Sequence, residues 1–301
     1  MALSPQLNFR VLYFKLVATA LIWGGTFIAG RIAVQSLGPF TAAFLRFAIA
    51  SLSLLLVVHR THSHLPPLDS AQRWSVLWLG LTGIFGYNAL FFGGLQTVEA
   101  GRASLIIALN PVAIALGAAL FLKEPLNSRK QLGILISLLG AVWVISRGEL
   151  TTLLTNLSDS FGIGELMLLG CVLSWMSYTL IGKAVMRTLS PLVASAYACW
   201  IGTLLLLPIA IYEGLWQTVS SIQLEALLSV SYLGILGSAV GFCWYYDGLN
   251  AIGSAKASAF INLVPVSAIA LGVIILREVP TPSITIGAIL VILGVSITNR
   301  A

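Results

Sequence analysis

Residues 100–126 read AGRASLIIALNPVAIALGAALFLKEPL, and residues 254–279 repeat this pattern as SAKASAFINLVPVSAIALGVIILREV. A shift of 154 residues brings the proline near the middle of each stretch, Pro111 and Pro265, into register. The same shift pairs the surrounding glycines and charges: Arg102 with Lys256, Lys123-Glu124 with Arg277-Glu278, and Gly133 and Gly140 with Gly287 and Gly294. Matches of helix-breaking and charged residues at one spacing indicate an internal duplication.

The duplication covers nearly the whole chain. In its N-terminal part the shift is 152 residues, which pairs Trp23 with Trp175 and Pro39 with Pro191. We therefore expect five segments: an N-terminus (1–11), a first repeat (12–147), an outer linker (148–160), a second repeat (161–298) and a C-terminus (299–301). Secondary transporters are commonly built from two such units, with the substrate bound between them.

The composition is that of a membrane protein. Only 9% of the 301 residues are charged and 58% are apolar, whereas a soluble domain carries about 25% charged residues. A bilayer core about 30 Å thick needs about 20 helical residues to cross it. Cutting the chain at charges and at Pro/Gly clusters predicts an all-α fold with ten membrane-spanning helices: 12–33, 38–58, 74–95, 99–121, 130–147, 161–182, 191–211, 226–248, 254–275 and 283–298.

Five helices per repeat is an odd number, so the two repeats are expected to have inverted topology in the membrane. Lysine and arginine mark the cytoplasmic side of a membrane protein. With the N-terminus inside, the cytoplasmic ends hold Arg10, Lys15, Arg60, Arg73, Lys123, Arg129, Lys130, Lys183, Arg187, Lys256 and Arg300. The outer ends hold only Arg31, Arg102, Arg147 and Arg277. Both termini are therefore predicted to be cytoplasmic.

Several partners and cofactors are not expected. The three cysteines fall inside predicted helices without paired or ligand-like spacing, so neither a metal nor another cofactor is predicted. The net charge of +6 is explained by the cytoplasmic loops, and no nucleic acid is needed to account for it. The first apolar run, 11–33, is long enough to span and belongs to the repeat, so we expect no cleavable signal peptide. The expected partners are the lipid bilayer and a small-molecule substrate, with the protein a monomer or weak homodimer.

Two interrupted helices are the first candidates for a substrate site. Pro111 and Pro265 each lie about ten residues into a span, and each frees the carbonyl group four residues earlier. Asn110 and Asn262 stand close to these prolines. Polar amides within a span line either a substrate site or a kinked packing helix, in which the amide bonds to its neighbours.

Aromatic residues deep in the spans are the second candidates, because a buried hydroxyl or indole N–H requires a partner. Similar residues at helix ends, such as Trp74, are better explained by the headgroup belt. The predicted substrate-binding residues of this group are Trp23 and Thr26 in the first span, Tyr87, Asn88 and Phe91 in the third, Trp175 and Tyr178 in the sixth, and Tyr245 and Tyr246 in the eighth.

Charged residues within or beside the spans have other predicted roles. Arg46 lies about eight residues into the second span, where it either binds a substrate carboxylate or anchors neighbouring helices, and we favour anchoring. Glu124 and Glu278 follow the two interrupted helices at opposite membrane faces, which suggests capping or gating. Asp247 lies within reach of the turn that holds Lys256, and a local ion pair is expected there. Glu165 is expected at the start of the sixth helix, where the helix dipole favours a carboxylate.

The glycine pairs of the last span in each repeat have a packing role. Gly133 and Gly140, like Gly287 and Gly294, are two helical turns apart, so each pair lies on one face and lets a neighbouring backbone approach. We therefore expect the fifth and tenth helices to form a scaffold. The first, third, fourth, sixth, eighth and ninth helices are then expected to form the pathway.

The repeat also resembles a known family. The stretches LIWGGTFIAGRIAV (21–34), PFTAAFLRF (39–47), QLGILISLLGAVWV (131–144) and the two stretches quoted first are similar to the EamA domain, found in the ten-helix branch of the drug/metabolite transporter superfamily. The resemblance implies a secondary transporter and no enzymatic activity. Its nearest likeness is to exporters of amino acids and aromatic metabolites in bacterial inner membranes.

Two transport mechanisms are compatible with this resemblance. The first is export of amino acids, aromatic or other neutral ones, by alternating access at a central cavity. The second is proton-coupled extrusion of cationic or aromatic drugs, which would need a carboxylate within the membrane. Of ten acidic residues, only Glu165 and Asp247 fall even partly within predicted spans. The sequence therefore favours export without obligatory proton exchange.

Overall fold

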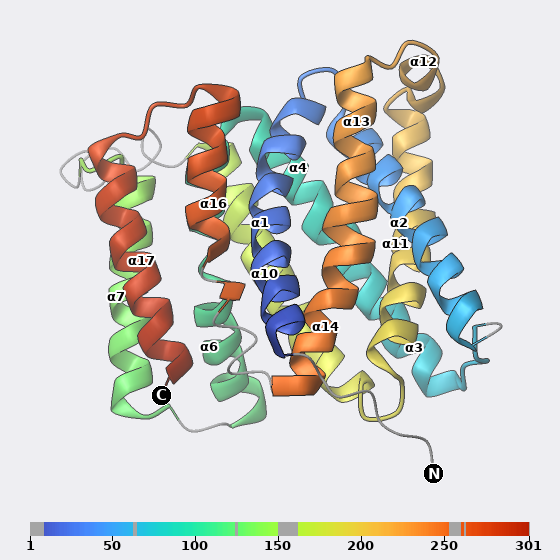
Figure 1. Cartoon of the computed structure of the whole chain (residues 1–301), viewed down its shortest axis with the longest axis horizontal. Coiled ribbons are helices and arrows are strands. Elements are labelled where there is room, and N and C mark those ends of the chain that lie inside the picture. Colours follow the sequence, from blue (N-terminus) through green and yellow to red (C-terminus); the bar gives the residue numbers. More distant parts are fainter. Residues whose placement is uncertain are drawn as a thin grey trace.

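The computed structural model describes residues 9–62, 65–123, 126–149, 162–252, 260–261 and 263–300. Every regular element in these residues is a helix (Figure 1). Eight helical segments are long and apolar enough to cross a membrane, and two shorter apolar helices cover Leu263–Leu276 and Pro282–Thr298. The predicted all-α membrane fold is therefore confirmed.

The helix ends agree with the predicted spans to within four residues wherever both are described. Several spans are built from more than one element, and α12 is a short helix in a connecting segment that the sequence did not predict. The elements are α1 (Phe9–Ala33), α2 (Pro39–His62), α3 (Ser70–Leu79), η1 (Gly80–Gly86), α4 (Tyr87–Thr97), α5 (Ala100–Ile107), α6 (Asn110–Leu122), α7 (Ser128–Ile145), α10 (Ile163–Val185), α11 (Pro191–Tyr212), α12 (Leu215–Ser220), α13 (Leu224–Tyr232), η2 (Leu233–Val240), α14 (Gly241–Ile252), α16 (Leu263–Leu271), η3 (Gly272–Leu276) and α17 (Pro282–Arg300).

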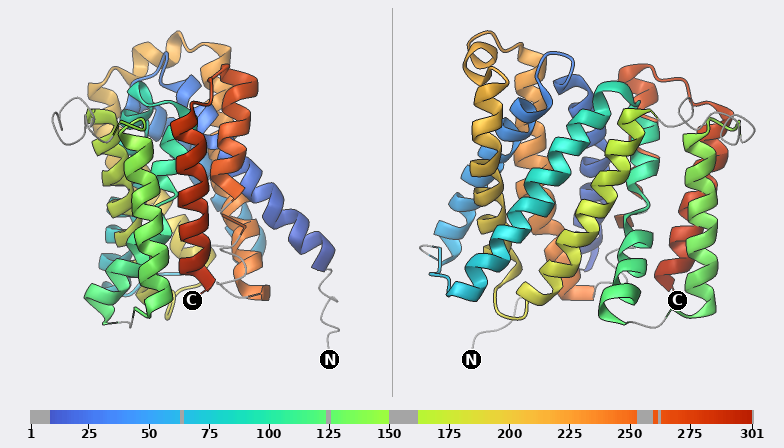
Figure 2. Two further views of the ribbon diagram at one scale, coloured as in Figure 1. Left: turned by 90° about the vertical axis from the view of Figure 1, so that its left-hand side faces the viewer. Right: turned by 180° about the vertical axis from the view of Figure 1, so that it is seen from behind.

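The helices stand side by side, and α1 begins and α17 ends at the same end of the molecule, which is the lower end in Figure 1. The α7–α17 pair forms one side of the bundle, and α2 and α11 form the other. Between them lie α1, α10 and the helices that pack on them (Figures 1 and 2). Segments from both halves of the chain therefore meet in the centre.

The contacts between helices occur in matched sets. Helix α1 packs against α13, η2 and α14, while α10 packs against α3, η1 and α4. Helix α1 also contacts α16, and α10 contacts α6. In the same way α2 contacts η2, and α11 contacts η1. Each of these contacts made by α1 or α2 thus has a counterpart made by α10 or α11.

The α7–α17 pair is held together at the predicted glycines. A Cβ atom on Gly133 would lie 2.7 Å from the carbonyl oxygen of Gly294, and one on Gly294 would lie 2.6 Å from that of Gly133. A Cβ atom on Gly287 would lie 3.1 Å from the carbonyl oxygen of Gly140. Because the two backbones touch, only glycine fits closely at the crossing. The predicted packing role of these residues is confirmed.

Irregular backbone recurs at corresponding places in the two halves. Lys123 ends α6 with φ of 55°, and Arg277 follows η3 with φ of 56°, so the same left-handed turn closes both spans. The π-helices η1 and η2 interrupt the third and eighth spans at positions that the 154-residue shift nearly superimposes. Such π-helical turns are rare and occur frequently at functional sites.

The predicted interruption of the fourth span is also present. Helix α5 ends at Ile107, and α6 begins at Asn110 with Pro111 in its first turn. Pro265 lies buried in the first turn of α16. Asn262 lies outside the described residues, as do Glu124 and most of the predicted linker.

Candidate functional site

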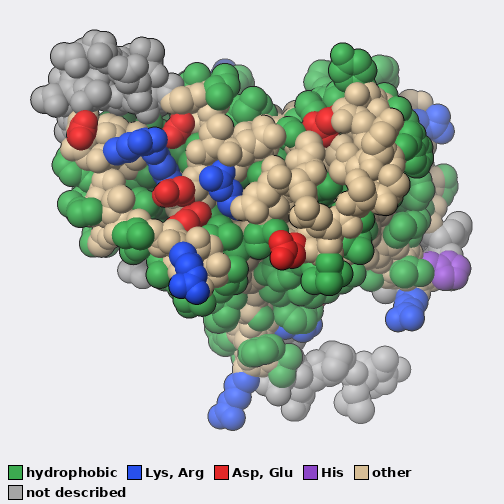
Figure 3. Space-filling model, turned by 90° about the horizontal axis from the view of Figure 1, so that it is seen from above, with side chains coloured by type: hydrophobic (Ala, Val, Ile, Leu, Met, Phe, Trp, Pro, Cys, Tyr) green, Lys and Arg blue, Asp and Glu red, His purple; other side chains and the backbone are tan. Residues whose placement is uncertain are grey.

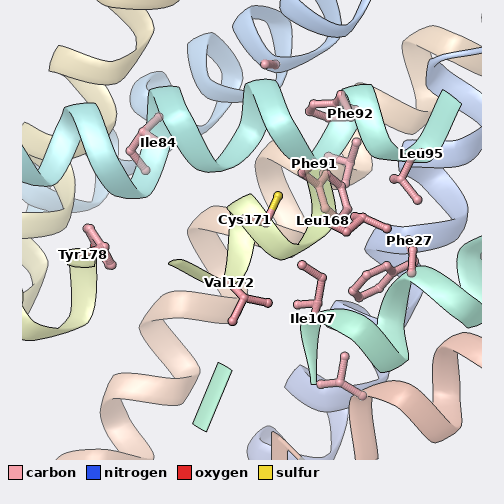
Figure 4. Packing of buried hydrophobic residues seen from close by; sticks show 14 of the residues in the cluster. Phe27, Ile84, Phe91, Phe92, Leu95, Ile107, Leu168, Cys171, Val172 and Tyr178 are labelled. Carbon is pink, nitrogen blue, oxygen red and sulfur yellow. The ribbon is translucent and has the colours of Figure 1, made fainter. Parts of the chain in front are cut away.

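The interior is tightly packed in the upper half of the bundle. All eight residues of α5 are buried, whereas most residues between Asn110 and Phe121, below the interruption, are half-buried or exposed. Figure 4 shows Phe27, Phe91 and Ile107 converging from three helices. The lower end of α1 projects away from the bundle (Figure 2). The part of the fourth span above the interruption is therefore more deeply buried than the part below it.

Two carboxylates hold helix N-termini at the upper end. Glu278 accepts hydrogen bonds from the backbone N–H groups of Ala100 (2.8 Å) and Gly101 (3.1 Å), which start α5. Glu278 thus caps α5 in this structure, and gating by Glu278 stays a prediction. Glu213 binds the N–H groups of Phe40 and Thr41 at the start of α2 in the same manner. The sequence analysis missed this second contact, because it joins residues more than 170 positions apart. A carboxylate suits the positive end of a helix dipole in both cases.

A buried ion pair lies beside α5. A guanidinium nitrogen of Arg102 is 3.1 Å from a carboxylate oxygen of Glu165, and both side chains are buried. Arg102 also donates a hydrogen bond to the carbonyl group of Ile145, which ends α7. Glu165 stands in the first turn of α10, as predicted, but its partner was not predicted. The pair fixes α5 between α7 and α10.

The predicted aromatic residues form a continuous cluster in the centre, which we call the aromatic chain (Trp175, Tyr178, Tyr87 and Phe91). Trp175 lies 5.1 Å from Tyr178 and 5.3 Å from Tyr87 between ring centroids. Tyr87 stacks on Phe91 at 5.8 Å with an interplanar angle of 14°. The ring of Tyr178 lies against Gly83 of η1, where any side chain would collide with it. The absence of a side chain at Gly83 thus makes room for this ring.

A second aromatic group surrounds Trp23 of α1. Its ring centroid lies 5.2 Å from that of Tyr245 and 5.9 Å from that of Phe242, both on α14. Its indole nitrogen donates to the carbonyl oxygen of Gly237 in η2 at 2.9 Å. The hydroxyl group of Thr26 donates to the carbonyl group of Trp23 within the same helix. The side chain of Tyr246 lies outside the described part of the chain.

Asn88 makes structural contacts. It is buried, accepts a hydrogen bond from Arg46 at 3.0 Å, and donates to the carbonyl oxygen of Ile84 at 2.8 Å. Arg46 also approaches the hydroxyl oxygen of Ser238 in η2 at 3.3 Å. Arg46 therefore joins α2 to α4 and η2, which are the contacts expected of an anchor.

Asn110 differs from Asn88 because its amide oxygen is buried and has no hydrogen-bond partner in the structure as described. The oxygen lies at the interruption between α5 and α6. An unpaired buried acceptor is costly unless a ligand or water meets it. Asn110 is therefore a candidate for binding a polar group of a substrate.

Asp247 forms an ion pair at the lower end, but with a residue that is distant in the sequence. Its carboxylate lies 2.8 Å from the amino group of Lys15 on α1, and both side chains are partly exposed. Lys256, in the turn where the sequence analysis placed its partner, lies outside the described residues.

A cavity lies elsewhere in the molecule. It has a volume of about 470 Å³ and is lined at the upper end by residues of α5, α7 and the start of α17, including Arg102, Trp143 and Arg147. Side chains of both charges gather on one part of this upper face (Figure 3). None of the predicted substrate-binding residues lines this cavity.

These features define a multi-pass helical membrane protein with polar groups and interrupted helices in its interior. The model of the EamA-like transporter family matches the chain twice, over residues 11–146 and 162–300. The chain belongs to the EamA-like transporter family, within the drug/metabolite transporter superfamily. It is a membrane transporter of small molecules and not an enzyme.

Curated relatives match along nearly the whole chain. An uncharacterized transporter of Bacillus subtilis, YyaM, is 30% identical over 94% of this chain and 92% of its own length. An uncharacterized transporter of Archaeoglobus fulgidus is 31% identical over 95% of this chain and 96% of its own. A protein of Streptantibioticus cattleyicolor, described as a probable terminal-alkyne amino-acid exporter, is 29% identical over 95% and 93%.

A solved crystal structure shares the fold. It superimposes with a TM-score of 0.66 and covers 96% of both chains, at 21% sequence identity.

Proposed function

We propose that this chain exports neutral amino acids, aromatic ones above all, by alternating access at a central site between its two halves. The observation that carries the proposal is the aromatic chain, which runs through the centre of the bundle beside Phe27 of α1. Stacked rings bind flat apolar side chains well. One relative described as an amino-acid exporter supports the same substrate class.

The architecture proposed for this function is ten spans in two inverted repeats, 12–147 and 161–298. Three observations support it: the family model matches twice, the central contacts occur in matched sets, and Lys123 and Arg277 close equivalent spans in the same backbone conformation. Transporters of this design bind substrate near the midplane, at the interface of the repeats. The aromatic chain is drawn from both halves, with Tyr87 from the first and Trp175 from the second.

The proposed orientation has the lower end and both termini in the cytoplasm of a bacterial cell, with the protein in the inner membrane. Basic side chains are the marker of that side. With this orientation the buried helix α5 and its capping carboxylate lie on the outer side, and the site is proposed to be reached from the cytoplasm. That is the state in which an exporter takes up its substrate.

Within the site we assign different roles to the predicted residues. Trp23, Tyr87, Phe91, Trp175, Tyr178 and Tyr245 are proposed to surround the substrate, with Asn110 as a hydrogen-bond acceptor. Tyr246 and Asn262 remain in the proposal on the grounds of the sequence alone. Thr26 and Asn88, whose polar groups bond within the protein, are proposed to position their neighbours.

The function is tested by counterflow. Liposomes carrying the purified protein are loaded with one unlabelled compound, and entry of the same labelled compound is measured across a panel of amino acids, nucleosides and organic cations. The proposal expects the fastest exchange for tryptophan, phenylalanine and tyrosine. Exchange confined to nucleosides or organic cations would overturn it.

A further inference from the structure

Arg46 is a buried cation within a membrane span. It lies seven residues after Pro39, or about 10 Å along α2. Only 8% of the residue is exposed. A charge at this depth is costly unless it reaches an opposite charge or a polar cavity, and residues of this kind in transporters mark substrate pathways.

The partners of Arg46 are all neutral. Its Nε atom approaches Ser238, its Nη1 atom donates to Asn88, and the guanidinium group lies 5.0 Å from the ring centroid of Phe47. Ser238 and Asn88 themselves donate to backbone carbonyl groups, which turns their oxygen atoms toward the arginine. Among the described residues, neither a carboxylate within 4 Å of Arg46 nor a hydrogen-bond partner of its Nη2 atom is found.

Arg102 has a carboxylate partner of the kind that Arg46 lacks among the described residues. Both arginines are buried to a similar degree, but Arg102 has the carboxylate of Glu165 beside it. The protein thus neutralises one buried arginine with its own acid and leaves the other with neutral acceptors. A buried charge of this kind is stabilised when an anion arrives.

The surroundings of Arg46 lead to the aromatic chain. Its partner Asn88 follows Tyr87 directly in α4. Tyr87 contacts both Trp175 and Phe91. A carboxylate held at Arg46 would therefore stand at the edge of a group of rings that can accept an apolar side chain.

We infer that Arg46 binds the carboxylate of the transported compound through its free Nη2 atom, while the compound's side chain packs against Tyr87 and Trp175. This inference rests on the proposed function and deepens it. The substrates are carboxylic acids with an aromatic or bulky apolar side chain. Organic cations are repelled by the same guanidinium group. The contacts with Asn88 and Ser238 orient the arginine for this task, so anchoring and binding are two roles of one side chain.

The test compares ligands that differ only at the carboxylate. Binding of phenylalanine and phenylalaninamide, and of tryptophan and tryptamine, is measured by calorimetry on the purified full-length protein in detergent. The wild-type protein is expected to bind each acid at least about tenfold more tightly than its neutral or cationic counterpart, since a hydrogen bond to a charged group is at stake. In Arg46→Gln the acids should weaken by about tenfold or more, while phenylalaninamide changes little.

Two further variants separate binding from folding. Arg46→Lys keeps the charge and should retain part of the preference for acids. Arg31→Gln is the matched control, because Arg31 bonds the carbonyl group of Leu95 near the upper end and should leave the preference unchanged.

The outcomes are distinguishable. Equal weakening of acids and amides in Arg46→Gln would reduce Arg46 to a structural residue and overturn the inference, while the proposed function would stand. If Arg46→Gln does not fold, the wild-type comparison decides, since equal binding of acid and amide also overturns the inference. Binding of nucleosides or organic cations in place of every aromatic compound would overturn the proposed function as well.

Discussion

Replacing Glu278 by glutamine should open the upper end of the transporter. The carboxylate of Glu278 accepts two backbone hydrogen bonds from the N-terminus of α5 and so ties that helix to the end of the ninth span. Glutamine keeps one acceptor oxygen but loses the second acceptor and the charge. Hydrogen bonds to charged groups contribute about 1.5–3 kcal/mol each, and the interaction with the helix dipole adds about 0.3–1 kcal/mol.

A loss of about 2 kcal/mol changes the ratio of closed to open molecules by a factor of about 30. Alternating conformations of a transporter typically differ by only a few kcal/mol, so this change should be visible as a shift in population. The shift should raise the exposure of residues on α5 that are buried in the closed form. Ser104 is such a residue, being 1% exposed.

The assay uses a single cysteine at Ser104 in a chain from which Cys171, Cys199 and Cys243 have been removed. An impermeant thiol reagent is added to intact cells, and the rate of labelling is measured. Labelling should be slow with Glu278 present and at least about tenfold faster with Glu278→Gln. Glu225→Gln, which alters an exposed glutamate in the first turn of α13, serves as the control. Equal labelling rates in the parent chain, Glu278→Gln and Glu225→Gln would refute the claim that Glu278 stabilises the buried position of α5.

Three other predictions follow from the site and the scaffold. Trp175→Ala should weaken the binding of aromatic amino acids about tenfold, because it removes two ring contacts, whereas Trp74→Ala, at an exposed position, should not. Equal losses of affinity in the two variants, measured by calorimetry, would contradict this prediction. Gly294→Ala should destabilise the protein by about 1–3 kcal/mol, because the new Cβ atom would meet the backbone of α7, whereas the Cβ atom of Gly182→Ala would make only ordinary contacts. Similar thermal unfolding midpoints for the two variants would contradict the scaffold role of the α7–α17 pair. Transport in liposomes should persist without a pH gradient and in the variant Asp247→Asn, because Asp247 forms a partly exposed ion pair with Lys15. Uphill accumulation of substrate that depends on the pH gradient would instead show proton coupling.

Local features of the chain could be predicted from the sequence. Span boundaries follow from apolar run length, the interruption at Pro111 follows from its missing N–H group, and the contact of α7 with α17 follows from the spacing of small residues. Each of these depends on residues close together in the sequence. The depth of Tyr87 and Trp175 within their spans could also be read from their positions along the chain, whereas the contact between their rings could not.

Pairs of distant residues could not be predicted. The contact of Glu213 with the start of α2 and the pairing of Arg102 with Glu165 depend on how whole helices pack, which no local pattern encodes. The same holds for Asn88, whose amide accepts a hydrogen bond from Arg46 and donates one to the backbone carbonyl oxygen of Ile84. The π-helices were missed because a wide turn leaves no composition signal beyond glycines that are common in membrane helices.

Photo-crosslinking of a substrate analogue tests the central claim most directly. Purified protein in liposomes is irradiated with an azido derivative of phenylalanine, and the labelled peptides are identified by mass spectrometry, with excess tryptophan as competitor. The account predicts adducts on α4 and α10, near Tyr87 and Trp175, that tryptophan suppresses. Adducts confined to the cavity at the upper end, near Trp143 and Arg147, would contradict a central aromatic site.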